Sequence, residues 1–165
     1  MLKFFVPYIA LAIAFNVFFY STLTNTDLFR RYLAATATVA AAIIRALGVE
    51  AASASGSIDS SRFAISVKTG CDGLQPIALF IIAVVLAPAS LRSRLWGVGI
   101  GGLLLLVLNV TRIVTLFLAG VYVPSVFEAF HIDVWQGLFI LITLGLWIAW
   151  ARWALAPAGA RDGER

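Results

Sequence analysis

Three side chains in this sequence could together carry out a reaction. Cys71 is the only cysteine and His131 the only histidine, and Arg112 lies between them inside a long apolar run. A cysteine thiolate attacks carbonyl carbons, an imidazole accepts and returns a proton, and a guanidinium stabilises a developing oxyanion. If the fold brings these groups together, they are sufficient for acyl transfer.

Cys71 stands in the segment TGCDGLQP, which is predicted to join a loop to a helix. A helix N-terminus stabilises a thiolate and lowers its pKa, and Gly70 and Gly73 would let backbone or substrate approach closely. Asp72 is a candidate cap for the same helix. The alternative interpretation is that Cys71 is a buried structural thiol.

Arg112 stands in the segment NVTRIV. An arginine at membrane depth is energetically costly and therefore indicates a functional site. Asn109, three residues earlier, shares its helix face and could orient the guanidinium or form a hydrogen bond to another helix. The alternatives are that Arg112 extends to the membrane interface or pairs with an acid, either Glu128 or Asp133.

His131 stands in the segment FHIDVWQG. The near-neutral pKa of histidine suits it to general acid or base catalysis; alternatively it is an interfacial residue bonded to a neighbour. Asp133 could cap the helix that follows. One cysteine and one histidine cannot supply the three or four ligands of a zinc site, so no metal site is predicted, and no intramolecular disulfide can form.

The elements that must position these residues are predicted to be transmembrane helices. Hydrophobic residues make up 62% of the 165 residues and charged residues 12%, more apolar surface than a soluble domain of this size could bury. The apolar runs predict an all-α, polytopic transmembrane helical bundle of about five spans. We expect the spans at residues 4–23, 28–47, 74–90, 95–119 and 134–155, in a single domain over 1–156 with a cytoplasmic polar tail over 157–165.

Two polar segments separate these spans. Asn25, Thr26 and Asp27 form a predicted turn with a helix cap. Residues 62–68 alternate between polar and apolar and predict a short strand, with Ile58 in its partner strand. We therefore expect a short β-hairpin-like loop on the extracytoplasmic side before the third span. The second span is rich in alanine and threonine, which suits helix packing better than lipid contact.

Basic residues predict the orientation of the bundle. Five spans would place the two termini on opposite sides, and a cytoplasmic C-terminus would put seven basic residues inside and four outside, as the positive-inside rule favours. Cys71, Arg112 and His131 would then share the extracytoplasmic face of the cell (inner) membrane. The net charge of +4 is thus explained by topology, and no base-reading motif indicates binding of nucleic acid.

In order and context, these motifs resemble the exosortase/archaeosortase family. The segments that carry the resemblance are GCDGLQP around Cys71, NVTRIV with Asn109 and Arg112, and HIDVWQG with His131 and Gly137. The likeness covers roughly residues 66–141 and suggests a compact member. This sequence has Asp72 where family members often have a small residue after the cysteine.

The resemblance implies a membrane-embedded cysteine protease and transpeptidase without a metal or organic cofactor. Its partners would be membrane lipid and exported proteins whose C-terminal signal combines a short motif, a transmembrane helix and a basic cluster. Cys71 would form a thioester and pass the acyl group to an acceptor, and Arg112 and His131 would complete the site. The expected supporting residues are Asn109, Asp72, Gly73, Asp133 and Gly137.

Two other functions fit the residues. The chain could be a non-enzymatic membrane assembly factor or partner subunit, which would suit its size and its second helix. It could also be a small transporter with Arg112 as an anion site, although the sequence shows no repeated halves and no polar lining across several spans.

Overall fold

The computed structural model describes residues 2–156, although the side chains of residues 2–4, 132 and 133 are not among the described ones. The chain is mostly helical, as predicted, and has one small sheet. The long helices are α1 (Leu2–Ser21), α2 (Asp27–Ala46), α3 (Leu74–Leu86), α5 (Gly102–Tyr122) and α7 (Trp135–Ala154). The short helices are α4 (Leu91–Trp96) and α6 (Phe127–Ala129), with 3-10 turns η1 (Leu23–Asn25) and η3 (Pro124–Val126) and π-helical turns η2 (Gly97–Gly101) and η4 (Phe130–Val134).

Among the described residues, three helices are long and apolar enough to cross a membrane. They are Phe5–Asn25, Leu91–Tyr122, in which α4, η2 and α5 form one continuous helix, and Trp135–Ala154. α3 is apolar but has 13 residues, a length of about 20 Å at 1.5 Å per residue. The predicted number of five spans is therefore not confirmed.

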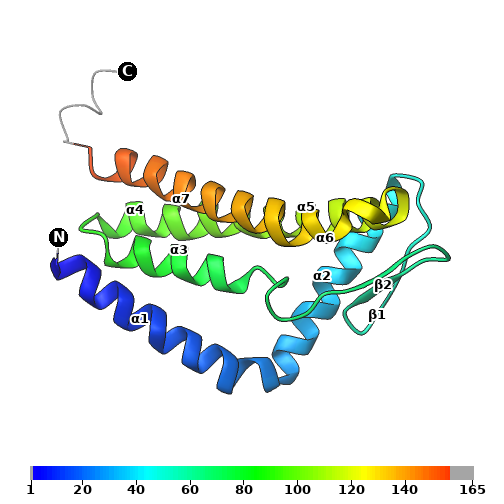
Figure 1. Ribbon diagram of the computed structural model, residues 1–165. Helices are drawn as coiled ribbons and strands as arrows, with labels where there is room; N and C mark the ends of the chain where they lie inside the picture. The colour runs from blue at the N-terminus through cyan, green and yellow to red at the C-terminus, as the bar shows by residue number, and fades with distance from the viewer. Residues whose placement is uncertain (1, 157–165) are drawn as a thin grey trace.

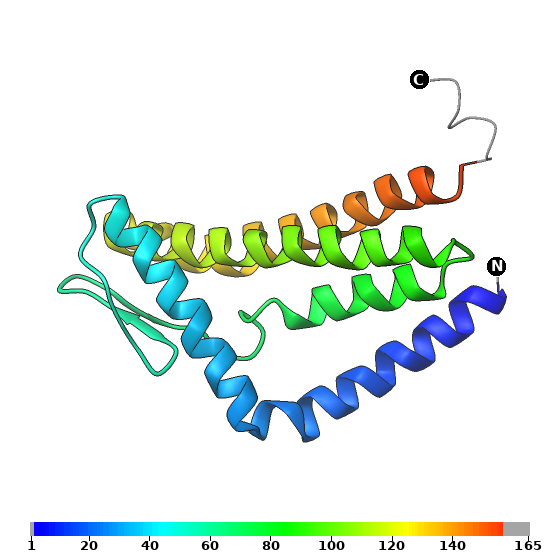
Figure 2. The same ribbon diagram turned by 180° about the vertical axis from the view of Figure 1, so that it is seen from behind.

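The second predicted span, α2, is amphipathic rather than apolar all round. Its buried residues Ala37, Ala40, Ala41 and Ile44 recur at the spacing of one helix face. Figures 1 and 2 show α2 crossing the bundle at an angle instead of running back along α1, so that α1 begins and α7 ends at the same end of the bundle. This arrangement differs from the prediction that the two termini lie on opposite sides.

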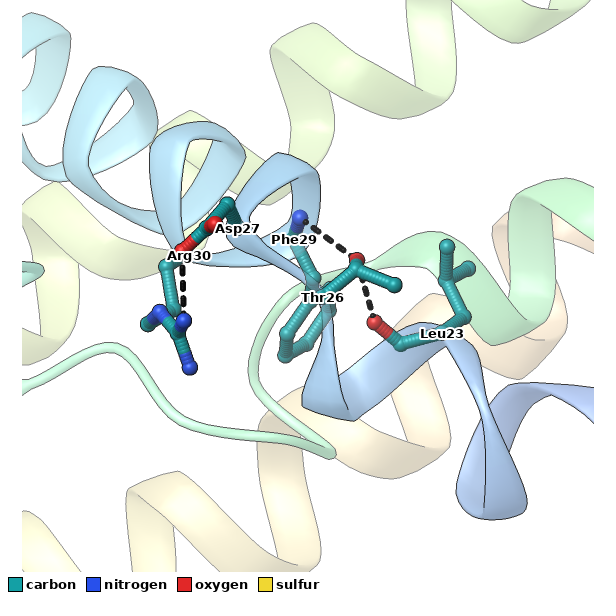
Figure 3. Close-up of polar contacts among 5 residues, drawn as sticks. All are labelled: Leu23, Thr26, Asp27, Phe29 and Arg30. Carbon is teal, nitrogen blue, oxygen red and sulfur yellow. Dashed lines mark hydrogen bonds and ion pairs between the residues drawn. The ribbon is translucent and has the colours of Figure 1, made fainter.

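The bend between α1 and α2 is fixed by the predicted cap (Figure 3). The Thr26 hydroxyl accepts a hydrogen bond from the Phe29 amide at 3.2 Å and donates one to the Leu23 carbonyl at 2.7 Å. In the first turn of α2, Asp27 forms an ion pair with Arg30. These contacts satisfy amide and carbonyl groups that a helix terminus otherwise leaves unpaired.

The sheet before α3 has three short antiparallel strands, one more than the predicted hairpin. They are β1 (Ala52–Ala54), β2 (Ser57–Asp59) and β3 (Ala64–Ser66), in the order β1-β2-β3. Ile58, at the centre, is paired with Ser53 on one side and with Ile65 on the other. In Figure 1 the sheet lies beside α2, and we refer to this end of the bundle as the sheet end.

Two buried apolar clusters share α5. At the sheet end, the apolar face of α2 packs with Ile58 and Val67 against Ile113, Val114 and Phe117 of α5. Towards the other end, Ile77 and Phe80 of α3 pack with Leu105 of α5 and Phe139 of α7. α5 is therefore the helix against which the other elements are placed.

Candidate functional site: a cysteine, histidine and arginine at the sheet end

The loop from Lys68 to Gly73, which carries Cys71, is held in shape by Asp72. The Asp72 side chain is 1% exposed, and its carboxylate accepts hydrogen bonds from the Gly70 and Leu74 amides, both at 2.8 Å. The Cys71 amide donates to the Lys68 carbonyl at 2.9 Å. Asp72 therefore caps α3 and turns the chain so that Cys71 precedes the helix.

Gly73 is required for this turn by both its conformation and its surroundings. Its φ of +76° lies in the left-handed region that favours glycine. A Cβ atom at this position would lie 2.7 Å from Cγ of Asn109, closer than van der Waals contact allows. The side chain of Asn109 is 1% exposed and has little room to move.

His131 faces Cys71 from the η4 turn. The distance from Cys71 Sγ to His131 Nε2 is 2.9 Å, within hydrogen-bond reach of a thiol and an imidazole. The imidazole ring stacks on Phe127, four residues earlier, with centroids 5.8 Å apart and an angle of 12° between the planes. Phe127 in turn contacts Phe63 of the β2–β3 connection, so the sheet supports the position of the histidine.

Arg112 approaches the same sulfur from α5. Its Nη2 lies 3.9 Å from Cys71 Sγ, and its side chain is 7% exposed. Among the described side chains it forms no ion pair with an acid, and its Nε has no hydrogen-bond partner there. The structure thus brings Cys71, His131 and Arg112 together from three separate elements, and it does not pair Arg112 with Glu128.

The electrostatics of the site favour a neutral thiol beside a neutral imidazole. Burial raises the pKa of the Cys71 thiol above its ordinary value, and the Arg112 guanidinium, which acts in the opposite direction, offsets this only in part. Burial lowers the pKa of His131, and Arg112 lowers it further, against a smaller effect of Glu128. Both directions favour a protonated thiol and a neutral imidazole, and Nε2 accepts the thiol proton in the tautomer that carries its own proton on Nδ1.

This result differs from the expectation that the helix N-terminus lowers the pKa of Cys71. Cys71 lies two residues before Gly73, which occupies the N-cap position of α3. The influence of a helix terminus is confined to about its first turn. The carboxylate of Asp72 already occupies this terminus through the Leu74 amide, so its positive end is neutralised before it reaches the thiol.

The carbonyl of Asp72 has two donors, and one of them was not predicted. Asn109 Nδ2 donates to it at 2.9 Å and the Tyr32 hydroxyl at 2.6 Å. Asn109 therefore bonds to the loop before α3 and not, as one of its two predicted roles had it, to another helix. Tyr32 belongs to α2. The sequence feature that could have indicated it is its polar group, which lies on the helix face that also carries the buried residues Phe29 and Thr36.

Two of the expected supporting residues have no described contact with the site. Gly137 lies in the first turn of α7, where a Cβ atom would meet nothing within 4 Å. The side chain of Asp133 lies outside the described residues. Over the described part of the chain, no group of three or more His, Cys, Asp or Glu residues could hold a metal ion.

Comparison with known proteins gives one family. A family model described as transmembrane exosortase (Exosortase_EpsH) matches residues 1–149, which include every residue of the site described above. Neither the curated proteins nor the solved structures contain a match. The family match extends over the first two helices, beyond the motifs on which the resemblance in the sequence rested.

Proposed function

Since this chain belongs to the transmembrane exosortase family, we propose that it is a membrane-embedded cysteine protease and transpeptidase. It cleaves exported proteins at a C-terminal sorting signal and transfers them to an acceptor. The observation that carries this proposal is the 2.9 Å contact between Cys71 Sγ and His131 Nε2, beside an arginine that forms no ion pair among the described side chains. That is the arrangement of a nucleophile, its base and an oxyanion donor.

The reaction proceeds in two acyl transfers. Cys71 Sγ attacks the carbonyl carbon of the scissile peptide while its proton passes to His131 Nε2. The oxyanion is stabilised by Arg112, and when the C–N bond breaks the proton passes from His131 to the leaving amine. The acceptor nucleophile then loses its proton to His131 and attacks the thioester, which releases the product and the Cys71 thiolate, and the thiolate recovers that proton.

The neutral ground state supports general base catalysis over a preformed ion pair. A raised thiol pKa and a lowered imidazole pKa together disfavour a thiolate–imidazolium pair before attack. Proton transfer therefore accompanies attack on the substrate. A thiol held in this state is also less reactive towards other electrophiles, because the thiolate is the nucleophilic form.

We further propose that the chain crosses the membrane four times, with the sheet end outside. The crossing elements are α1, α3, the continuous α4–α5 helix and α7, while α2 and the sheet lie over the site. Arg92 and Arg94 lie in α4, directly after the short connection from α3, and basic residues beside a short connection favour the cytoplasmic side. The site then faces the compartment that exported substrates enter.

Removal of the nucleophile tests the proposed reaction. Co-expression with a tagged protein that ends in a sorting signal should give full processing by the wild type and none by Cys71→Ala. Arg112→Lys keeps the charge but loses the planar donor fork, and we expect it to lower the rate by about 10²–10³-fold, as loss of an oxyanion donor does.

The matched control is Arg45→Lys. Arg45 also lies at the sheet end, where it donates to the Ala51 carbonyl at 2.9 Å, but it has no contact with Cys71. The Arg45→Lys variant should process the tagged substrate at the wild-type rate. Normal processing by Cys71→Ala would contradict the proposal and favour a non-enzymatic assembly partner.

A further inference from the structure

The main-chain carbonyl that follows the nucleophile is bound from two helices. Asp72 O accepts from the Tyr32 hydroxyl, 40 residues away in α2, and from Asn109 Nδ2, 37 residues away in α5. A carbonyl oxygen has two lone pairs, so its hydrogen-bonding capacity is filled. Neither helix is adjacent to this loop in the sequence.

These two bonds anchor the loop to the rest of the protein. Apart from the helical bonds of α3, the other backbone hydrogen bonds described for residues 70–74 are made within the segment 68–77. They are Cys71 to Lys68, Gly70 and Leu74 to the Asp72 carboxylate, and Ile77 to Gly73. They shape the loop but do not place it against α2 or α5. Val67 and α3 pack against the bundle on either side of the loop, and between them the position of Cys71 relative to His131 and Arg112 depends on what binds the Asp72 carbonyl.

The packing of α2 explains why Tyr32 can reach this carbonyl. Phe29, Thr36 and Ala40 are buried on the same side of α2, at the spacings of one helix face relative to Tyr32. The second half of α2 is held against α5 through Ala37 and Ala41. With its far half fixed in this way, the first half of α2 extends over the Cys71 loop.

We propose that Tyr32 is a positioning residue for the nucleophile: its hydroxyl holds the Asp72 carbonyl and thereby keeps Cys71 Sγ at His131 Nε2. This inference rests on the proposed function. It gives α2 a role in the site that needs no membrane crossing. Because a displacement of about 1 Å can cost on the order of 10²-fold in rate, one hydroxyl at this carbonyl affects the reaction without touching the substrate.

The substitution Tyr32→Phe removes this hydroxyl and keeps the ring. Loss of one of two donors loosens the loop, so the thiol becomes more exposed and the pKa of Cys71 moves down towards its ordinary value. We expect kcat for substrate processing to fall about five- to tenfold, the effect of one lost hydrogen bond, with KM unchanged.

Alkylation of the thiol measures the position of the loop without any substrate. Cys71 is the only cysteine, so iodoacetamide labels this site alone. In the full-length protein in detergent micelles, Tyr32→Phe should be alkylated at least about threefold faster at neutral pH, with a midpoint at lower pH, since the thiolate is the reactive form. Asn109→Ala removes the other donor and should shift the profile in the same direction.

The matched control is Tyr122→Phe, because Tyr122 is 63% exposed and lies at the C-terminal end of α5, ten residues after Arg112. Its alkylation profile and its kcat should equal those of the wild type. If the alkylation profiles of Tyr32→Phe and Asn109→Ala coincide with the wild type, or if Tyr122→Phe shifts as much, the positioning role is wrong. Since alkylation needs no substrate, it tests Tyr32 even if Cys71→Ala shows that the proposed reaction does not occur.

Discussion

Gly73→Ala is a substitution for which the structure predicts two separate costs from a single methyl group. The residue has φ +76°, and its missing Cβ would lie 2.7 Å from Asn109 Cγ and 2.9 Å from Asn109 Cβ. The alanine must therefore adopt an unfavourable backbone conformation and also displace a buried side chain. Displacing Asn109 would disturb its hydrogen bond to the Asp72 carbonyl and move the Cys71 loop.

The magnitude follows from these two costs. A positive φ costs a residue with a side chain about 1–2 kcal/mol, and overpacking a buried site costs about 1–3 kcal/mol. Gly73→Ala should therefore destabilise the protein by about 2–5 kcal/mol. Gly48→Ala is the matched control, since Gly48 has φ +83° but nothing within 4 Å of its Cβ position, and it should cost only the backbone part.

Thermal unfolding in detergent, followed by tryptophan fluorescence, measures the difference. At about 2–4 °C per kcal/mol for a chain of this size, the midpoint should fall clearly further for Gly73→Ala than for Gly48→Ala. Asn109→Ala in the Gly73→Ala background removes the contacts at Cγ and Oδ1, so the double variant should lose less than the sum of the single losses. Equal midpoints for Gly73→Ala and Gly48→Ala would refute the packing argument.

Three further predictions concern pH, support and topology. Because the reaction needs a neutral His131 whose pKa lies below the ordinary 6.5, the rate of processing should stay high below pH 6.5 and fall only as the imidazole becomes protonated; a fall centred at or above 6.5 would contradict this. Gly120→Ala would direct a methyl group into the Phe63 ring, which supports Phe127 and His131. The midpoint of thermal unfolding and the rate of processing should therefore both decrease. An unchanged rate would show that the sheet does not support the position of His131. Alkaline phosphatase fused at either terminus should be inactive in whole cells and active when inserted in the β2–β3 connection; activity of the N-terminal fusion would exclude four crossings.

The membrane class and the meeting of three side chains could be predicted from the sequence for the same reason. Apolar runs long enough for a bilayer have few structural alternatives. Cys71 and His131 each precede such a run and Arg112 lies in the second half of one, so helices that alternate in direction bring all three to one face. The detailed contacts, such as the 2.9 Å distance between Sγ and Nε2, depend on side-chain packing that no spacing encodes.

The direction of α2 could not be predicted because its composition is ambiguous. Its alanines serve equally for helix contact in a membrane and for packing on a single face. The direction of α2 is set by the bend at Thr26 and by the cluster that α2 forms with Ile58 and Val67. These two residues lie outside the helix, so the composition of α2 does not reveal the contact. The same tertiary contact makes Tyr32 part of the site, which explains why no local motif pointed to it.

Arg112, which forms no ion pair with any acid whose side chain the structure describes, connects the fold to the proposed reaction. Burying a guanidinium without an acid costs free energy. The apolar packing of α5 with α2 and the sheet offsets this cost in the folded protein. An acidic partner would stabilise the folded protein, but it would also neutralise the charge that the developing oxyanion requires. Because Arg112 Nε has no partner among the described residues, a substrate oxygen that gains negative charge would find a donor already in place. In the proposed reaction, this arrangement would lower the stability of the folded protein and stabilise the transition state more than the ground state, which is the condition for catalysis.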